Sequence, residues 1–281
     1  MRFLVIGDFH GDFPERLIKL IKKEKIELVV SNGDYFPFHY RRLWFKYSYR
    51  KERELWEIIG KKKYKELVIK DLKMGERALK KLNDMGVPAI TVVGNVDYSR
   101  GNDQYDFKNS KRNWKWDDQD FFSKIILKYK NISRFDYSFF KFNDYTFIGA
   151  SGGSSPGDVK SKAYRKSKRK LDELFIKFKK ENKKGKVIFV SHNVPFNTRL
   201  DKITWKDAEK SVKGKHYGSK LVRRIIEKYQ PVLAFGGHIH ESWGKDRLGK
   251  TEIVNPGAIH EGKYAIVDIN GKKRKIKFGR I

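Results

Sequence analysis

The sequence predicts an α/β domain, and two alternating patterns carry this prediction. Short β-branched runs recur along the chain, and each is bounded by Gly, Asn, Asp or Ser, as buried strands are. The runs are Arg2–Ile6, Leu28–Val30, Ala89–Val93, Thr146–Ile148, Lys186–Val190, Val232–Phe235 and Glu252–Val254. Between several of them, apolar residues recur at helical spacing, within Leu17–Ile21, Leu171–Phe178 and Leu221–Tyr229. Strands that alternate with helices are typical of an α/β domain.

The C-terminal part follows a different pattern. Closely spaced strands are predicted at Thr251–Val254, Tyr264–Asp268 and Lys275–Phe278, with a turn at Asn270 and Gly271. We expect these strands to form an antiparallel meander. A length of 281 residues fits one large domain. We therefore expect a single domain over residues 1–281, with insertions at about 35–73 and 100–116 that interrupt the alternation.

Composition and charge limit the classes of function. The chain has 64 Lys and Arg against 34 Asp and Glu, so its formal charge is +30. Such an excess favours anionic partners, including nucleic acid, although a solvated basic surface explains it equally well. The absence of cysteine excludes disulfides, thiolate metal sites and thiol nucleophiles. We see neither a signal peptide nor an apolar run long enough to span a membrane, so we expect a cytoplasmic protein.

Polar residues follow five of the predicted strands at the point where each strand ends. They are Asp8 and His10, then Asp34, then Asn95 and Asp97, then His192 and Asn193, and finally His238 and His240. The carboxyl ends of strands in an open α/β sheet form the edge at which ligands bind. Glycines beside these residues allow tight turns and close approach of the backbone. We therefore expect the five segments to converge on one site.

The side chains at these strand ends have the composition of a metal site. The candidate ligands are Asp8, His10, Asp34, Asn95, His192, His238 and His240. A lone Asp-x-His or Gly-Asp pair is more often a turn than a ligand pair, but five such pieces in order, each after an apolar run, are poorly explained by chance. One ion rarely needs seven protein ligands, whereas two ions that share a carboxylate do. Nitrogen and oxygen ligands suit Mn, Fe, Zn, Co or Ni.

The order of these motifs resembles that of the calcineurin-like metallophosphoesterases, whose pattern is D-x-H, G-D, G-N-H-D/E, a lone H and G-H-x-H. The match runs from Asp8 to His240, and residues 254–258 resemble the closing motif. The resemblance implies a four-layer α-β-β-α sandwich and two divalent metal ions, with manganese favoured. It assigns Asp8, His10, Asp34 and His240 to one ion. It assigns Asp34, Asn95, His192 and His238 to the other, so Asp34 would bridge both.

The resemblance also implies a phosphate-ester substrate and a hydrolytic mechanism. Two neighbouring ions lower the pKa of a water between them, and the resulting hydroxide attacks phosphorus in line with the leaving oxygen. The chain departs from the pattern at Val96, where many members of the family carry a histidine that assists the leaving group. Valine cannot donate a proton, so the leaving group must be good or stabilised otherwise. Smaller phosphodiesterases of the family also lack this histidine, which favours a nucleotide-type or other small phosphodiester.

Three other functions remain open at this stage. A nuclease would use the basic aromatic residues within 40–51 together with Trp114 and Trp116 to grip single strands. A phosphomonoesterase is disfavoured by Val96, and a non-catalytic scaffold by the complete ligand set. We expect Asn95, Asp97 and His192 to be catalytic, and Asn193 and His216 to contact the substrate. Two further histidines, His39 and His260, are expected on the surface. The sequence gives no oligomeric state.

Overall fold

A computed structural model describes residues 1–49, 51–99, 114–117, 119–153, 155, 157–206, 208, 210, 212–271 and 273–281. Its strands are β1 (Arg2–Ile6), β2 (Leu28–Ser31), β3 (Ala89–Thr91), β4 (Ile132–Arg134), β5 (Phe139–Phe142), β6 (Tyr145–Ala150), β7 (Val187–Asn193), β8 (Leu233–Gly237), β9 (Gly244–Leu248), β10 (Thr251–Asn255), β11 (Lys263–Asn270) and β12 (Lys273–Arg280). Its helices are α1 (Arg16–Lys23), α2 (Arg41–Tyr47), α3 (Leu55–Ile59), α4 (Lys61–Asn83), α5 (Phe121–Ile126), α6 (Lys162–Lys177), α7 (Lys179–Lys183), α8 (Lys220–Tyr229) and the 3₁₀ turn η3 (Ile259–Glu261). Among these helices, none combines the length and the apolar character that crossing a membrane requires.

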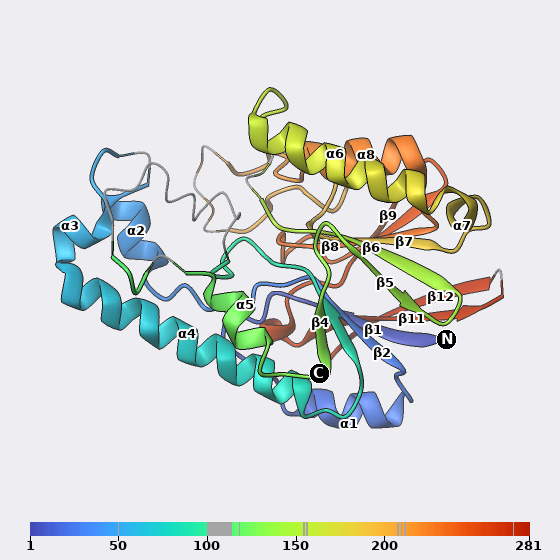
Figure 1. The fold of residues 1–281 in the computed structure, drawn as a ribbon, viewed down its shortest axis with the longest axis horizontal. Coiled ribbons are helices and arrows are strands. Elements are labelled where there is room, and N and C mark those ends of the chain that lie inside the picture. Colours follow the sequence, from blue (N-terminus) through green and yellow to red (C-terminus); the bar gives the residue numbers. More distant parts are fainter. Residues whose placement is uncertain are drawn as a thin grey trace.

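The strands form two six-stranded sheets, in the orders β12-β11-β1-β2-β3-β4 and β5-β6-β7-β8-β10-β9. Helices α1, α4 and α5 cover the first sheet, and α6 and α8 cover the second (Figure 1). The two sheets pack face to face through a shared apolar cluster that includes Phe3, Ile188 and Phe235. The layers are therefore α-β-β-α, and the predicted four-layer sandwich is confirmed.

The alternation of side chains along β1 shows how one strand serves two layers. Leu4 and Ile6 point to the helical layer that contains α1 and α4. Phe3 and Val5 point to the layer between the sheets. Both faces are apolar because successive residues of a strand point to opposite sides and both sides are buried here. This explains why the predicted strands are continuous apolar runs without alternating polar residues.

The predicted C-terminal meander is wrong in its first strand. β11 and β12 form the expected antiparallel hairpin in the first sheet. β10 instead lies in the second sheet, where it pairs parallel with β8 and antiparallel with β9. Strand β9 was not predicted, because its alternation of exposed and half-buried residues leaves no apolar run. Proximity in sequence suggested that β10 would pair with the C-terminal hairpin, whereas β10 is buried beside β8 in the other sheet.

The stretch 35–73 contains α2, α3 and the first half of α4. Helix α4 begins within the predicted insertion, at Lys61, and continues to Asn83. Trp114 and Trp116 stack with ring centroids 5.7 Å apart, and Trp114 also contacts Trp56. Residues 100–113 of the second predicted insertion lie outside the described residues. The single domain and both insertions stay our proposal.

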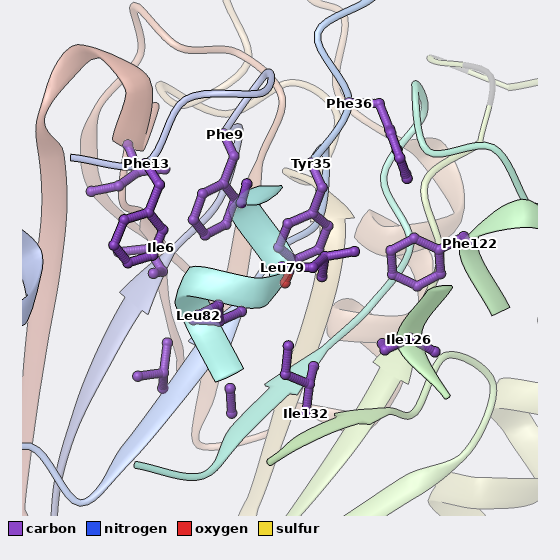
Figure 2. Packing of buried hydrophobic residues seen from close by; sticks show 14 of the residues in the cluster. Ile6, Phe9, Phe13, Tyr35, Phe36, Leu79, Leu82, Phe122, Ile126 and Ile132 are labelled. Carbon is purple, nitrogen blue, oxygen red and sulfur yellow. The ribbon is translucent and has the colours of Figure 1, made fainter. Parts of the chain in front are cut away.

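A row of aromatic rings supports the loops that follow β1 and β2. The rings of Phe9 and Tyr35 stack at 4.7 Å, and Phe13 and Phe122 extend the row on either side (Figure 2). All four rings are buried in one apolar cluster with side chains of α4 and α5. Phe9 lies between Asp8 and His10 in the sequence, so its burial fixes the segment that carries both polar residues.

Candidate metal centre

The polar residues predicted at the strand ends come together at one edge of the sandwich. β1, β2 and β3 run parallel in the first sheet, as do β7 and β8 in the second, so their carboxyl ends meet. The loops after β1 and β2 are joined by backbone hydrogen bonds, from Asp8 N to Gly33 O at 2.8 Å and from His10 N to Asp34 O at 2.9 Å. The two sheets thus contribute opposite walls of one site.

Short distances link the seven predicted ligands in an unbroken series. On the first side, Asp8 Oδ1 lies 3.2 Å from His240 Nε2, which lies 3.4 Å from His10 Nε2. On the second side, His192 Nε2 lies 2.7 Å from Asn95 Oδ1 and 3.2 Å from His238 Nδ1. Asp34 Oδ2 joins the two sides, because it lies 4.0 Å from His10 Nε2 and 3.4 Å from His192 Nε2.

Backbone hydrogen bonds fix the orientation of the central ligands. His192 Nδ1 lies 2.8 Å from the carbonyl oxygen of Asn32, so this nitrogen carries the proton and Nε2 presents a lone pair to the site. Asp34 Oδ1 accepts the backbone N–H of Val96 at 2.9 Å, which leaves Oδ2 for the other groups. Asp97 accepts the backbone N–H groups of Asp34, Tyr35 and Gly94 at 2.7–2.9 Å. It therefore holds the loops after β2 and β3 together.

The backbone is strained at the site. Asp8, His10, Asp34 and His238 all have positive φ, between 46° and 71°. Each such conformation costs about 1–3 kcal/mol in a non-glycine residue and persists only where the surroundings enforce it. Strain of this kind gathers at functional sites, and here it falls on four of the seven candidate ligands.

Three glycines leave room for the side chains of candidate metal ligands. A Cβ on Gly94 would lie 2.0 Å from Asp34 Oδ1, one on Gly237 would lie 2.6 Å from Asp8 Oδ2, and one on Gly152 would lie 2.8 Å from His192 Cδ2. The ligand geometry therefore depends on the absence of three side chains.

The histidines of the site differ in their protonation. Burial, followed by the charge of His240, lowers the pKa of His10 to about 3. Burial, followed by the charge of His192, lowers the pKa of His238 to about 3, and Arg41 of α2 adds to this effect. Burial also opposes the charged form of His240, but the Asp8 carboxylate outweighs it and raises the pKa of His240. His10 and His238 are therefore neutral at neutral pH, as metal ligands must be.

Burial and neighbouring charges also shift the pKa values of the carboxyl groups. Burial disfavours ionisation of Asp8, yet His240 and its neighbours hold the pKa of this carboxyl far below its usual range. Burial raises the pKa of Asp34, and the charge of Asp8 adds to the rise. Burial and the charge of Asp34 likewise raise the pKa of Asp97 to about 7. Three acidic groups this close need nearby positive charge to ionise together.

The arrangement fits divalent cations. Asp8 Oδ1 is fully buried without a hydrogen bond of good geometry. His192 Nε2, a lone pair in this tautomer, faces the oxygen of Asn95 and the carboxylate of Asp34. Lone pairs that converge in this way repel one another unless a cation lies between them. Potential ligand atoms also cluster in the groups Asp8, His10 and Asp34, and Asp34, His192 and His238, within 4.8 Å in each case.

A family profile described as calcineurin-like phosphoesterase matches residues 1–242. The chain belongs to this family. An uncharacterised protein of Methanocaldococcus jannaschii is 34% identical over 141 residues, which span 47% of this chain and 60% of that protein. The family acts on phosphate esters and implies two divalent metal ions, and the donor set described above is suited to them.

Solved structures support the same fold. One aligns with 99% of this chain and 98% of its own, with a TM-score of 0.68 and 20% identity. A Thermus thermophilus protein aligns over 99% and 98% of the two chains, with a TM-score of 0.57 and 15% identity. A dimetal phosphatase from Danio rerio covers 99% and 95%, with a TM-score of 0.54 and 12% identity. At these identities the likeness shows the calcineurin-like phosphoesterase fold alone.

Of the two predicted substrate contacts, Asn193 adjoins the candidate ligand His192 and His216 lies in a different cluster. Asn193 is buried, its Nδ2 donates to Ser155 Oγ at 2.7 Å, and its Oδ1 accepts the backbone N–H of Gly153 at 3.3 Å. It therefore ties the loop after β6 to β7. His216 belongs to a separate cluster, where its Nδ1 lies 2.6 Å from an oxygen of the buried Asp201. Both roles stay predictions.

His260 was expected on the surface, but its side chain is only 29% exposed and its ring packs against two of the predicted ligands. Its ring lies 5.1 Å from that of His10 and 5.3 Å from that of His240. The sequence signal was weak, since His260 lies two residues beyond the closing motif and no second motif residue accompanies it. His39, by contrast, is bonded through Nδ1 to the buried Asp71 at 2.6 Å and remains partly exposed.

Proposed function

We propose that the chain is a phosphodiesterase that hydrolyses a nucleotide-type or other small phosphodiester with two divalent ions, manganese being favoured. The observation that carries this proposal is that a valine, Val96, follows Asn95 in a chain whose set of candidate ligands is complete. Its backbone N–H holds Asp34, whereas its side chain, 8% exposed, offers neither a proton nor a positive charge. A diester bears one negative charge, and it can lose a good leaving group without a general acid.

The residues of the site have distinct roles in this proposal. When bound, the ions supply positive charge for the phosphate and acidity for water. Asp34 joins the two halves of the site, and Asp97 fixes the loops that carry Asp34 and Asn95. His192 is held by the carbonyl of Asn32, so its free nitrogen faces inward. The guanidinium of Arg41 adds positive charge on the side of His238, which favours an anionic substrate.

The deciding experiment compares aryl phosphodiesters with matching monoesters, using metal-stripped protein resupplied with Mn²⁺. We expect the diesters to be preferred and their rates to fall steeply as the leaving group becomes poorer. Val96→His is the matched variant, because it restores a proton donor of the kind that many relatives carry. It should flatten the dependence on the leaving group, since general acids contribute about 10²- to 10⁴-fold. Preference for monoesters by the unchanged protein would refute the proposal.

A nuclease is the second candidate, and the +30 charge favours it. Against it, the ring of Trp114 stacks on Trp116 and contacts Trp56 and Tyr64, so these rings are engaged within the protein. A linear fall of log affinity for single-stranded DNA with log salt, together with turnover of that DNA, would favour the nuclease. A phosphomonoesterase and a cytoplasmic location remain predictions that these assays and a localisation experiment would address.

A further inference from the structure

Two hydrogen bonds and a buried neighbour hold His260 against the segment that carries Asp8 and His10. The 3₁₀ turn η3 that carries it is tied to the loop after β1, because Ile259 N donates to Gly7 O at 2.9 Å. His260 Nδ1 lies 2.8 Å from the carbonyl oxygen of Asp8. Ile259 is fully buried and anchors the turn. The ring of His260 is therefore fixed to the segment that presents Asp8 and His10.

The contact with Asp8 determines which nitrogen of His260 is available. A carbonyl oxygen only accepts hydrogen bonds, so Nδ1 carries the proton. In the neutral ring, Nε2 then presents its lone pair. His192 uses the same arrangement, with Nδ1 bound to the carbonyl of Asn32. A hydrogen bond from one ring nitrogen to a backbone carbonyl is the usual support of a histidine that binds metal through the other.

A ring nitrogen of His260 lies among potential ligand atoms, and Nε2 of His260 also lies 4.0 Å from Glu261 Oε1. Ligand atoms of His10, His240 and His260 all lie within 4.8 Å of one another. The His260 side chain is only 29% exposed, and it makes edge contacts with both neighbouring rings.

We propose that His260 is a further protein ligand of the ion that Asp8, His10, Asp34 and His240 would hold. The inference rests on the dimetal function proposed above. His260 would bring the protein ligands of this ion to five, whereas Asp34, Asn95, His192 and His238 would supply four to the other ion.

A conservative variant separates ligation from positioning. In His260→Asn the amide nitrogen takes the place of Nδ1 and keeps the hydrogen bond to Asp8, but nothing replaces Nε2. His39→Asn is the matched control, because the His39 side chain is 36% exposed and is likewise bonded through Nδ1, in its case to Asp71. Metal-stripped samples of the unchanged protein and both variants are titrated with Mn²⁺ in a calorimeter and with Co²⁺ in the visible range.

We expect two bound ions per chain in the unchanged protein and in His39→Asn. In His260→Asn, one ion should bind at least tenfold more weakly and its Co²⁺ spectrum should change, because loss of even an indirect support of a metal site typically costs about 10- to 100-fold in affinity. Affinities and spectra equal to those of the unchanged protein would overturn the ligand role alone. Fewer than two ions in the unchanged protein would instead overturn the proposed dimetal function, and the ligand role with it.

A second measurement needs no variant. In protein loaded with ¹¹³Cd²⁺ and labelled with ¹⁵N-histidine, we expect nitrogen–cadmium coupling for His260 as well as for His10, His192, His238 and His240. His39 and His216 should show none. Coupling from the other four histidines without coupling from His260 would refute the proposal and leave the dimetal function intact.

Discussion

Gly94→Ala tests how closely the metal centre is built around Asp34. The new Cβ would lie 2.0 Å from Asp34 Oδ1 and 2.4 Å from Asp34 N, whereas real Cβ contacts are not shorter than 3.0 Å. Rotation of the Asp34 side chain cannot relieve the clash with its backbone nitrogen. The loop after β2 would therefore move by about 1 Å, and the bond from Val96 N to Asp34 would be lost.

The consequences can be given as magnitudes. Overpacking of this kind costs about 1–3 kcal/mol in the free energy of unfolding. A misplacement of about 1 Å at a catalytic site can cost about 100-fold in rate. We therefore expect Gly94→Ala to lose roughly that factor in diester hydrolysis and to bind metal more weakly, while the protein still folds.

Gly75→Ala is the matched control. Its Cβ would lie 2.1 Å from Cδ1 of the buried Phe36, so the crowding is similar, but the neighbour is an apolar ring of the core. We expect lower thermal stability and unchanged metal stoichiometry. Calorimetric metal titration, thermal unfolding and diester hydrolysis are measured on both variants. If Gly94→Ala binds two ions and turns over like the unchanged protein, the described packing around Asp34 is refuted.

Three further predictions follow from the same site. Metal affinity should rise with pH, because the pKa values of His240 and Asp34 are raised and both groups must lose their protons to bind metal. Calorimetry in buffers of different ionisation enthalpy counts the protons released. An affinity that falls between pH 6 and pH 8 would contradict the assignment of these ligands. His10 and His238, whose pKa values are about 3, should release none in that range. His216→Ala should raise KM for the diester and leave metal binding unchanged if His216 contacts the substrate; an unchanged KM would remove it from the substrate site.

The strand-end residues show what the sequence could predict. Each ligand follows an apolar run, and parallel strands bring such ends together regardless of loop detail. The four-layer sandwich could be expected from motif order alone. The position of Asp97 beneath two loops was not visible, because its three backbone donors come from segments that meet only in the folded chain.

His260 and β10 show where the sequence was insufficient. The position of His260 depends on the pairing of η3 with Gly7, more than 250 residues away in the chain. The partner of β10 depends on which sheet buries it, and local spacing suggested the wrong one. In α4, lysines at Lys61–Lys63 precede the apolar positions, so its true start was hidden in a stretch that looked like an insertion.

The most direct test of the central claim is the metal content and diester turnover of Asp34→Ala beside the unchanged protein. Asp34 is the one candidate ligand that both halves of the site share. We predict that the unchanged protein binds two ions and hydrolyses the diester, and that Asp34→Ala retains its fold but loses turnover and much of the bound metal. Retained turnover by Asp34→Ala with two ions bound would contradict the account.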